Sequence, residues 1–164
     1  MLGAEIIKLP TVSLHRMDDP QFLSPEGYDP KVWGKSLWLS MTIIASNMPL
    51  RPSRAQSVSY YRFFDGLRHV LPCKSCRTEY CRMIGEGAPS LRLKMSDFVQ
   101  TATEPPGSAR KRVFAWVVRI HAHVNRRLGK RRRSSVHFWA RAYSKLRRSS
   151  AEVSTIRFPS GNVR

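Results

Sequence analysis

Two cysteines separated by two residues are the strongest candidates for chemistry in this sequence. Cys73 and Cys76 follow Pro72 and open a segment with helical periodicity, so we expect them in the first turn of a helix. The unpaired N–H groups and positive dipole end of a helix stabilise a thiolate, and Lys74 and Arg77 add positive charge. The pattern predicts a redox-active pair. Half of a zinc site, or two buried structural thiols, are the alternatives.

Zinc would need two further ligands, and His121 and His123 are the close pair of histidines that the sequence offers. On a regular helix these two residues lie about 200° apart around the axis, so they cannot both point at one metal. We therefore predict no metal site. His121 shares a helical face with Asn125, because the two residues are four positions apart. This face would present an imidazole and an amide to one bound molecule. The alternative is that His121 is a structural residue. His123 is predicted to be a surface residue.

Several short motifs around these residues occur in a fixed order along the chain. A tryptophan-bearing segment comes first, a Pro-Cys-x-x-Cys second, and a segment with His121, Asn125 and Lys130 third. The ordered set resembles the Erv/ALR family of FAD-linked sulfhydryl oxidases over about residues 30–131. The compact, basic form is most similar to the versions of large cytoplasmic DNA viruses. The matching residues are Lys35-Ser36-Leu37-Trp38, Ala45, Pro49, Pro72-Cys73-Lys74-Ser75-Cys76, Trp116 and the segment from His121 to Lys130.

The resemblance implies a four-helix bundle with a short fifth helix, usually a homodimer, that binds FAD at the mouth of the bundle. It implies that Cys76 lies beside the flavin ring and that Cys73 meets the substrate. Its flavin-contact positions fall on Lys35, Trp38, Thr42, His121, Val124, Asn125 and Lys130.

This sequence departs from the family pattern at four positions. Thr42 stands where a histidine is usual, Asn47 where an aromatic residue is frequent, Ala122 where an asparagine is usual, and Leu71 where a tyrosine is frequent. A separate shuttle cysteine pair is absent from these 164 residues. The remaining Cys81 is interpreted as a packed or idle thiol, with a relay or an intersubunit disulfide as the alternative.

The resemblance also implies a reaction and its partners. A thioredoxin-like dithiol protein donates electrons by thiol–disulfide exchange at Cys73. The electrons pass through Cys76 and the flavin to oxygen, which gives hydrogen peroxide. We expect an intracellular protein, in the host cytoplasm or the virion if it is viral.

Six helical segments must position these residues, and we predict an all-α protein without paired strands. Apolar residues recur every three or four positions, with Pro or Gly near the ends of the runs. The predicted helices cover residues 30–48, 53–71, 74–84, a short piece at 96–101, a helix ending at Leu128 before Gly129, and a basic helix at 134–148.

The charge divides the chain into two regimes. The whole sequence has a net charge of +18; residues 1–106 hold 13 Lys and Arg against 10 Asp and Glu, whereas residues 107–164 hold 16 against one. We predict an extended arm at 1–28, an oxidase domain at 29–131 and a basic C-terminal extension at 132–164. The extension either has weak, sequence-independent affinity for nucleic acid or is a solvated surface. Alternatively, its helix at 134–148 docks on the bundle.

The composition excludes other classes of protein. Hydrophobic residues make up 41% of the chain, which is globular composition. No apolar run reaches the length of a membrane span, and the first 25 residues lack the pattern of a secretory signal. The competing function is a basic nucleic-acid-binding module whose cysteines are structural or bind metal.

Overall fold

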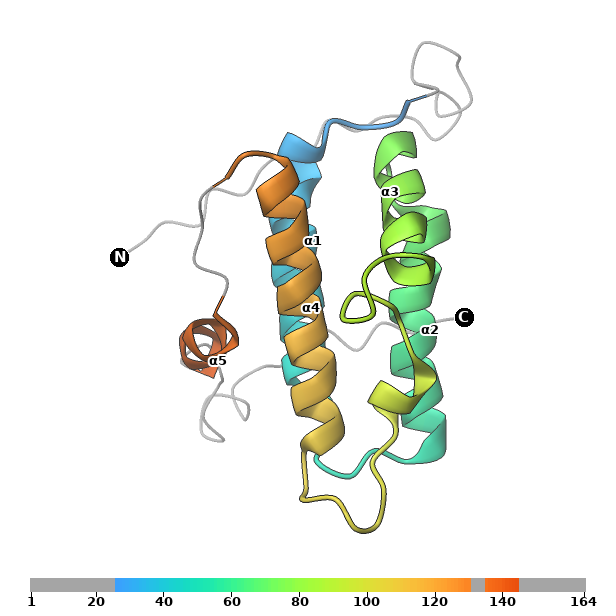
Figure 1. Cartoon of the computed structure of the whole chain (residues 1–164), viewed down its shortest axis with the longest axis vertical. Coiled ribbons are helices and arrows are strands. Elements are labelled where there is room, and N and C mark those ends of the chain that lie inside the picture. Colours follow the sequence, from blue (N-terminus) through green and yellow to red (C-terminus); the bar gives the residue numbers. More distant parts are fainter. Residues whose placement is uncertain (1–25, 131–134, 145–164) are drawn as a thin grey trace, which may run out of the picture.

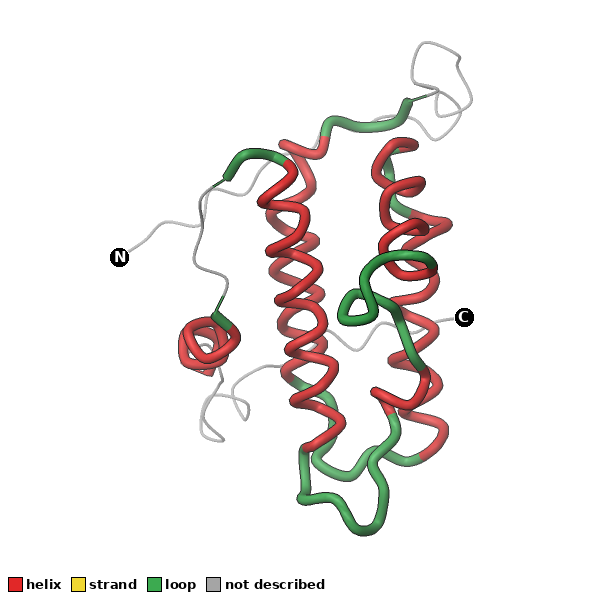
Figure 2. Tube along the Cα trace, viewed as in Figure 1, coloured by secondary structure: helices red, strands yellow, loops and turns green. Residues whose placement is uncertain are grey.

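The computed structural model describes residues 26–130 and 135–144, and these residues form helices joined by loops (Figures 1 and 2). The described part contains no strand ladder, so the predicted all-α class is confirmed. None of its helices is long and apolar enough to cross a membrane. The elements are α1 (Pro30–Ser46), α2 (Arg54–Val70), α3 (Lys74–Gly85), the 3-10 helix η3 (Met95–Phe98), α4 (Ser108–Arg127) and α5 (Val136–Ser144).

Capping residues explain where the helices begin. Asp29 accepts a hydrogen bond from the backbone N–H of Lys31 and precedes a proline at the first position of α1. Ser53 and Gln56 form a reciprocal capping box at the start of α2. The predicted boundaries of α1, α2 and α3 are confirmed to within a few residues. The short piece predicted at 96–101 is instead η3, because the backbone is already extended at Val99.

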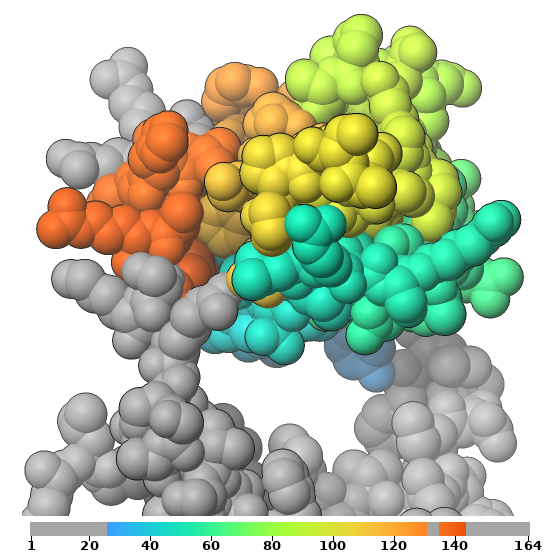
Figure 3. Space-filling view, turned by 90° about the horizontal axis from the view of Figure 1, so that it is seen from below, coloured from blue at the N-terminus to red at the C-terminus, as the bar shows by residue number. Residues whose placement is uncertain are grey.

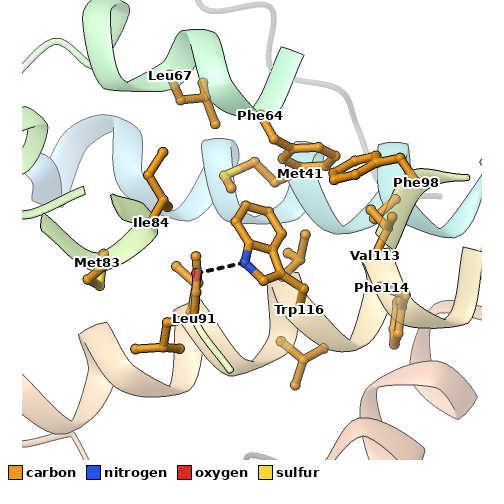
Figure 4. Packing of buried hydrophobic residues seen from close by; sticks show 14 of the residues in the cluster. Met41, Phe64, Leu67, Met83, Ile84, Leu91, Phe98, Val113, Phe114 and Trp116 are labelled. Atoms are coloured by element: carbon orange, nitrogen blue, oxygen red, sulfur yellow. Dashed lines mark hydrogen bonds between the residues drawn. The ribbon is translucent and has the colours of Figure 1, made fainter. Parts of the chain in front are cut away.

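The long helices pack as two pairs, α1 with α4 and α2 with α3, and η3 touches both α2 and α4. Figure 1 shows the pairs side by side, with α4 and α1 overlapping in the view. Figure 4 shows the core between them, where Phe64 and Trp116 meet edge to face at 5.3 Å and the Trp116 indole N–H donates to the Leu91 carbonyl at 2.9 Å. Phe64, Trp116, Met41 and Phe98 are almost completely buried. Together these contacts fix the spacing of the two pairs.

The helix α5 docks on α1 and α4. This agrees with the alternative prediction that the basic helix at 134–148 packs on the bundle. Val136, Trp139 and Tyr143 pack against the core cluster, and the ring of Tyr143 meets Phe114 at 6.4 Å. The domain limits at 28/29 and 131/132 stay a prediction. The N-terminal arm up to residue 25 and most of the basic extension lie outside the described residues.

Two loops close the end of the bundle opposite the Cys73–Cys76 turn. Figure 3 looks onto this end, where the surfaces of the α1–α2 connection (teal) and the η3–α4 connection (yellow) meet. The Gly107 N–H donates to the Leu50 carbonyl at 2.7 Å, and Gly107 has φ 83° with the Leu50 side chain 2.9 Å from where a Cβ would lie. The positive φ favours glycine at this contact, whereas the Leu50 side chain could move to make room for a Cβ.

Candidate functional site

Cys73 and Cys76 are joined by a disulfide at the start of α3, with their Cα atoms 5.1 Å apart. Cys73 is the N-cap of the helix, and its sulfur accepts a hydrogen bond from the backbone N–H of Cys76 at 3.2 Å. The Ser75 hydroxyl lies 3.2 Å from the same sulfur. Both groups stabilise negative charge on Cys73 when the disulfide opens, which favours the thiolate that exchange chemistry requires.

A short extended segment, Glu26 to Tyr28, covers the turn before the disulfide. Gly27 forms an antiparallel bridge with Cys73, and the Lys74 N–H donates to the Glu26 carbonyl at 2.9 Å. Gly27 has φ 84°, and a Cβ there would lie 2.3 Å from the Pro72 carbonyl oxygen. Cys73 is consequently only 5% exposed. The sequence signals this contact only by a glycine inside the predicted arm, and we did not predict it.

Trp38 of α1 and His121 of α4 stack face to face, with ring centroids 4.5 Å apart and planes 11° from parallel. Both side chains are half-buried. Trp139 of α5 lies on the same cluster, 6.2 Å from the His121 ring and tilted by 36°. The structure therefore brings together two of the predicted site residues and adds a third aromatic ring that sequence reasoning did not assign to the site.

The remaining predicted contact residues differ in how accessible they are. Val124 and Asn125 are half-buried near the end of α4, and Lys35 is exposed on α1. Thr42 is 4% exposed, and its hydroxyl donates to the Trp38 carbonyl at 2.7 Å. The hydroxyl hydrogen of Thr42 is thus already used within α1. All of these site assignments stay predictions.

A left-handed turn at the end of α4 places Lys130. Gly129 has φ 66°, and its N–H donates to the Arg126 carbonyl at 3.0 Å, while the Lys130 N–H donates to the Asn125 carbonyl at 2.9 Å. These two bonds form a Schellman cap, in which glycine is the preferred residue. The cap turns the backbone of Lys130 back towards that of Asn125.

A second face of α4 points to α3 rather than α1. The carboxylate of Glu79 on α3 forms ion pairs with Arg127 of α4 and with Arg82 of its own helix, and lies 3.9 Å from His123 Nε2. The hydrogen bonds from Arg82, then those from Arg127, hold the pKa of Glu79 at about 2, well below its usual value. His123 is 24% exposed and faces Glu79, so its prediction as a surface residue is wrong. Helical periodicity shows that it opposes His121 but not which helix packs there.

Other groups in the described part offer less. Cys81 is exposed, with its sulfur 3.9 Å from the Arg68 carbonyl oxygen. No cluster of three metal-ligating side chains occurs among residues 26–130 and 135–144. A hollow of about 260 Å³ lies beside α4, lined by Ala88, Ser90, Leu91, Arg119, Ala122, His123 and Arg126.

The start of α3, which carries the disulfide, and the end of α4 lie at the same end of the bundle, the upper end in Figure 1, while the Trp38–His121 stack lies midway along α1. A family model described as Erv1 / Alr matches residues 35–144 of the chain. The chain belongs to the Erv1 / Alr family. The matched range includes α5, and with it Trp139.

Individual relatives are consistent with this membership. The chain is 28% identical over 102 residues to a probable FAD-linked sulfhydryl oxidase of Acanthamoeba polyphaga mimivirus, which covers 62% of each chain. It is also 28% identical over 102 residues to a putative FAD-linked sulfhydryl oxidase of Invertebrate iridescent virus 3, covering 62% of this chain and 60% of that one. The chain thus spans about six-tenths of the length of these curated relatives.

Solved structures of the family share the fold. The FAD binding domain of Erv1 from Saccharomyces cerevisiae superposes with a TM-score of 0.56 at 22% identity, over 72% of this chain and 96% of that domain. The yeast Erv1 core gives a TM-score of 0.54 at 20% identity, over 85% of this chain and 96% of the core. The predicted four-helix bundle with a short fifth helix is confirmed.

Proposed function

We propose that the chain is a FAD-dependent sulfhydryl oxidase that forms disulfide bonds in dithiol proteins and passes the electrons through Cys73 and Cys76 to oxygen, giving hydrogen peroxide. The observation that carries the proposal is the Cys73–Cys76 disulfide in the first turn of α3, in a bundle whose helices α1 and α4 bring Trp38 and His121 into a stack. Family membership and the names of the viral relatives support it.

The residues of the predicted cofactor site fit a flavin dinucleotide. The half-buried aromatic rings of Trp38 and His121 offer stacking surfaces for planar ring systems. The last turn of α4 and its cap supply guanidinium and ammonium groups from Arg126, Arg127 and Lys130, the chemistry that binds phosphates. We infer that Lys35, Trp38, Thr42, His121, Val124, Asn125 and Lys130 hold the cofactor. When bound, the flavin supplies a two-electron acceptor and the chemistry with oxygen.

The chain's own chemistry is thiol–disulfide exchange. A substrate thiolate attacks the sulfur of Cys73, the Cys73–Cys76 bond breaks, and Cys76 leaves as a thiolate. A second substrate thiol loses its proton to solvent and attacks the substrate sulfur of this mixed disulfide. The substrate disulfide forms and Cys73 leaves as a thiolate, stabilised by the Cys76 N–H. When the Cys73–Cys76 bond forms again, the pair gives up two electrons, with Cys76 as the sulfur nearer to the acceptor.

We further propose a thioredoxin-like dithiol protein as the electron donor, because the 164 residues contain no second cysteine pair. The viral relatives support a viral origin and a location in the host cytoplasm or the virion. A homodimer is supported by apolar residues on the outer side of α1: Val32 is 79% exposed, Leu39 44% and Ile43 42%. Light scattering of the wild type and of Leu39→Glu tests the dimer, since a charge in a dimer interface produces a monomer.

The basic extension is proposed to bind nucleic acid weakly and without sequence preference. Such binding releases counterions, so it must weaken steeply with added salt. A truncation after Ser144 is the appropriate variant, because α5 packs on the core and must be kept. The truncation removes five basic residues and Glu152, so we expect the truncated protein to keep its oxidase activity and to show weaker, less salt-dependent retention on DNA. Unchanged retention contradicts the proposal.

An absorption spectrum of the purified protein tests the main proposal. A flavoprotein is yellow, with an oxidised flavin band near about 450 nm. A colourless protein that takes up no added FAD contradicts the proposal and favours the nucleic-acid-binding module. The oxygen step is tested by measuring hydrogen peroxide formed per dithiol oxidised, which must be one to one.

A further inference from the structure

The carboxylate of Glu79 joins the two halves of the proposed site. Backbone packing pairs α3 with α2 and α4 with α1, so the helix that carries the disulfide and the helix that carries His121 belong to different pairs. Within the described residues, the ion pair recorded between α3 and α4 joins Glu79 to Arg127, and the same carboxylate lies 3.9 Å from His123 Nε2. This one side chain therefore bridges the helix pairs at the end where the chemistry is proposed.

The bridging residues lie within two or three positions of the proposed site residues on their helices. Glu79 comes three residues after Cys76, so the two side chains leave α3 on the same side. His123 and Arg127 are four residues apart and share one face of α4. Each of them is two residues from a predicted flavin contact on the other face, His121 or Asn125.

The geometry at Glu79 is that of a fixed carboxylate. Arg82 donates to both oxygens, from Nε to Oε2 at 3.0 Å and from Nη2 to Oε1 at 2.7 Å, which orients the group. The oriented Oε1 then meets Arg127 and lies 3.9 Å from His123 Nε2. The side chain of Glu79 is 24% exposed, so solvent screens these contacts only in part.

We propose that Glu79 is a positioning residue, which holds the Cys76 end of α3 at a fixed distance from the flavin-binding end of α4. The inference rests on the proposed function and adds to it a residue whose recorded partners are Arg82, Arg127 and His123. A shift of about 1 Å between reacting groups can lower a rate by about 100-fold, so a link of this kind affects turnover without binding anything.

The test is spectroscopic and uses a Cys73→Ser background, in which the Cys76 thiolate is left beside the flavin. The proposed function predicts a long-wavelength charge-transfer band in that variant when FAD is saturating. In the Cys73→Ser background, we expect Glu79→Gln to lower the intensity of the band at least twofold. In the protein that retains Cys73, we expect Glu79→Gln to lower turnover about tenfold. The flavin content must equal that of the wild type in both cases. Arg127→Met, measured with excess FAD, is expected to lower the band equally, and combining it with Glu79→Gln to add nothing further.

Glu104→Gln is the matched control. Glu104 also pairs with an arginine through both oxygens, and the hydrogen bond from Arg112 likewise holds its pKa at about 2. It lies at the opposite end of the bundle, so its loss must leave the band and turnover unchanged. Equal bands in Glu79→Gln and Glu104→Gln, or loss of flavin from Glu79→Gln, overturn the positioning role. If Glu79→Gln does not fold, the intensity of the charge-transfer band in Arg127→Met at saturating FAD decides, and an unchanged band overturns the positioning role.

The failure of the inference and the failure of the proposed function give different results. A wild type that binds no flavin, or a Cys73→Ser variant without a charge-transfer band, contradicts the proposed function itself. A normal band in Cys73→Ser that Glu79→Gln leaves unchanged contradicts only the role of Glu79.

Discussion

The two ends of the bundle are built on different principles. At the end formed by the loops 47–53 and 99–107, polar side chains are hydrogen-bonded to backbone groups. The Arg112 guanidinium binds the Val99 carbonyl at 2.6 Å and the carboxylate of Glu104, and Arg110 donates to the Met48 carbonyl. The amide of Gln100 accepts from the Ala109 N–H and donates to the Pro105 carbonyl. Arginine and glutamine here satisfy loop groups that no helix ladder can reach.

At the disulfide end, the elements are held by a few side chains that also face solvent. Towards this end α3 is joined to α4 through Glu79, and midway along α1 Trp38 touches His121 through half-buried rings. Exposed cations at Lys35 and Lys130 have no carboxylate partner recorded in the described part of the chain. The comparison shows one end whose bonding groups are used to close the fold and another where Lys35 and Lys130 stay exposed, as the proposed cofactor site requires.

The largest expected effect comes from the disulfide. Cys76→Ser is expected to lower dithiol oxidation by at least about 1,000-fold, because the residues of a covalent relay act as a unit. The variant must stay yellow, since the flavin is held by other residues. Oxygen consumption with a small dithiol measures the loss. Cys81→Ser removes a thiol from the same helix and serves as the control with normal turnover. Oxidase activity retained by Cys76→Ser contradicts the assignment of this sulfur.

The next effect concerns flavin binding on the two faces of α4. His121→Ala is expected to weaken FAD binding about tenfold or more, because stacking on one ring contributes about 1–3 kcal/mol. His123→Ala removes a ring that faces α3 and must retain the flavin. The ratio of flavin to protein absorbance in the two purified variants measures the difference. Equal loss from both variants refutes the division of α4 into two functional faces.

A substitution at the closed end must affect stability and not the site. Arg112→Met leaves the Val99 and Asp97 carbonyls and the Glu104 carboxylate without their guanidinium. We expect a loss of about 2 kcal/mol, which lowers the melting temperature by roughly 4–8 °C. Flavin content and turnover at 25 °C (about 298 K) must be unchanged. A thermal melt followed by circular dichroism, run beside a flavin spectrum, separates the two readouts.

The smallest effect is expected in acid, where both ends should respond alike. The pKa values of Glu79 and Glu104 are lowered to about 2 by their arginines, from 4.5. Each ion pair therefore stabilises the fold fully above pH 4.5, and this stabilisation is lost as the pH falls from 4.5 towards 2. Melting temperatures recorded across this interval must fall less steeply in Glu79→Gln and Glu104→Gln than in the wild type. A slope that neither variant changes contradicts the ion pairs.

Much of the local structure follows from residues close together in the sequence. Asp29 with Pro30, and Ser53 with Gln56, mark helix starts because caps act over three or four residues. Gly129 marks the end of α4 for the same reason. Cys73 lies at the helix cap, as Pro72 and the following periodicity predict. The division of α4 into opposite faces for His121 and His123 is also a property of the helix alone.

What lies against each face was decided only by the tertiary structure. Trp38 meets His121 because α1 packs on α4. Glu79 meets Arg127 because the middle of α3 lies beside the last turn of α4. The bridge between Gly27 and Cys73 likewise joins segments far apart in the sequence. Periodicity fixes the direction of a side chain relative to its own helix axis. The neighbour it meets depends on how the whole set of helices fills the core, where the packing of Phe64 and Trp116 sets the distance between the pairs.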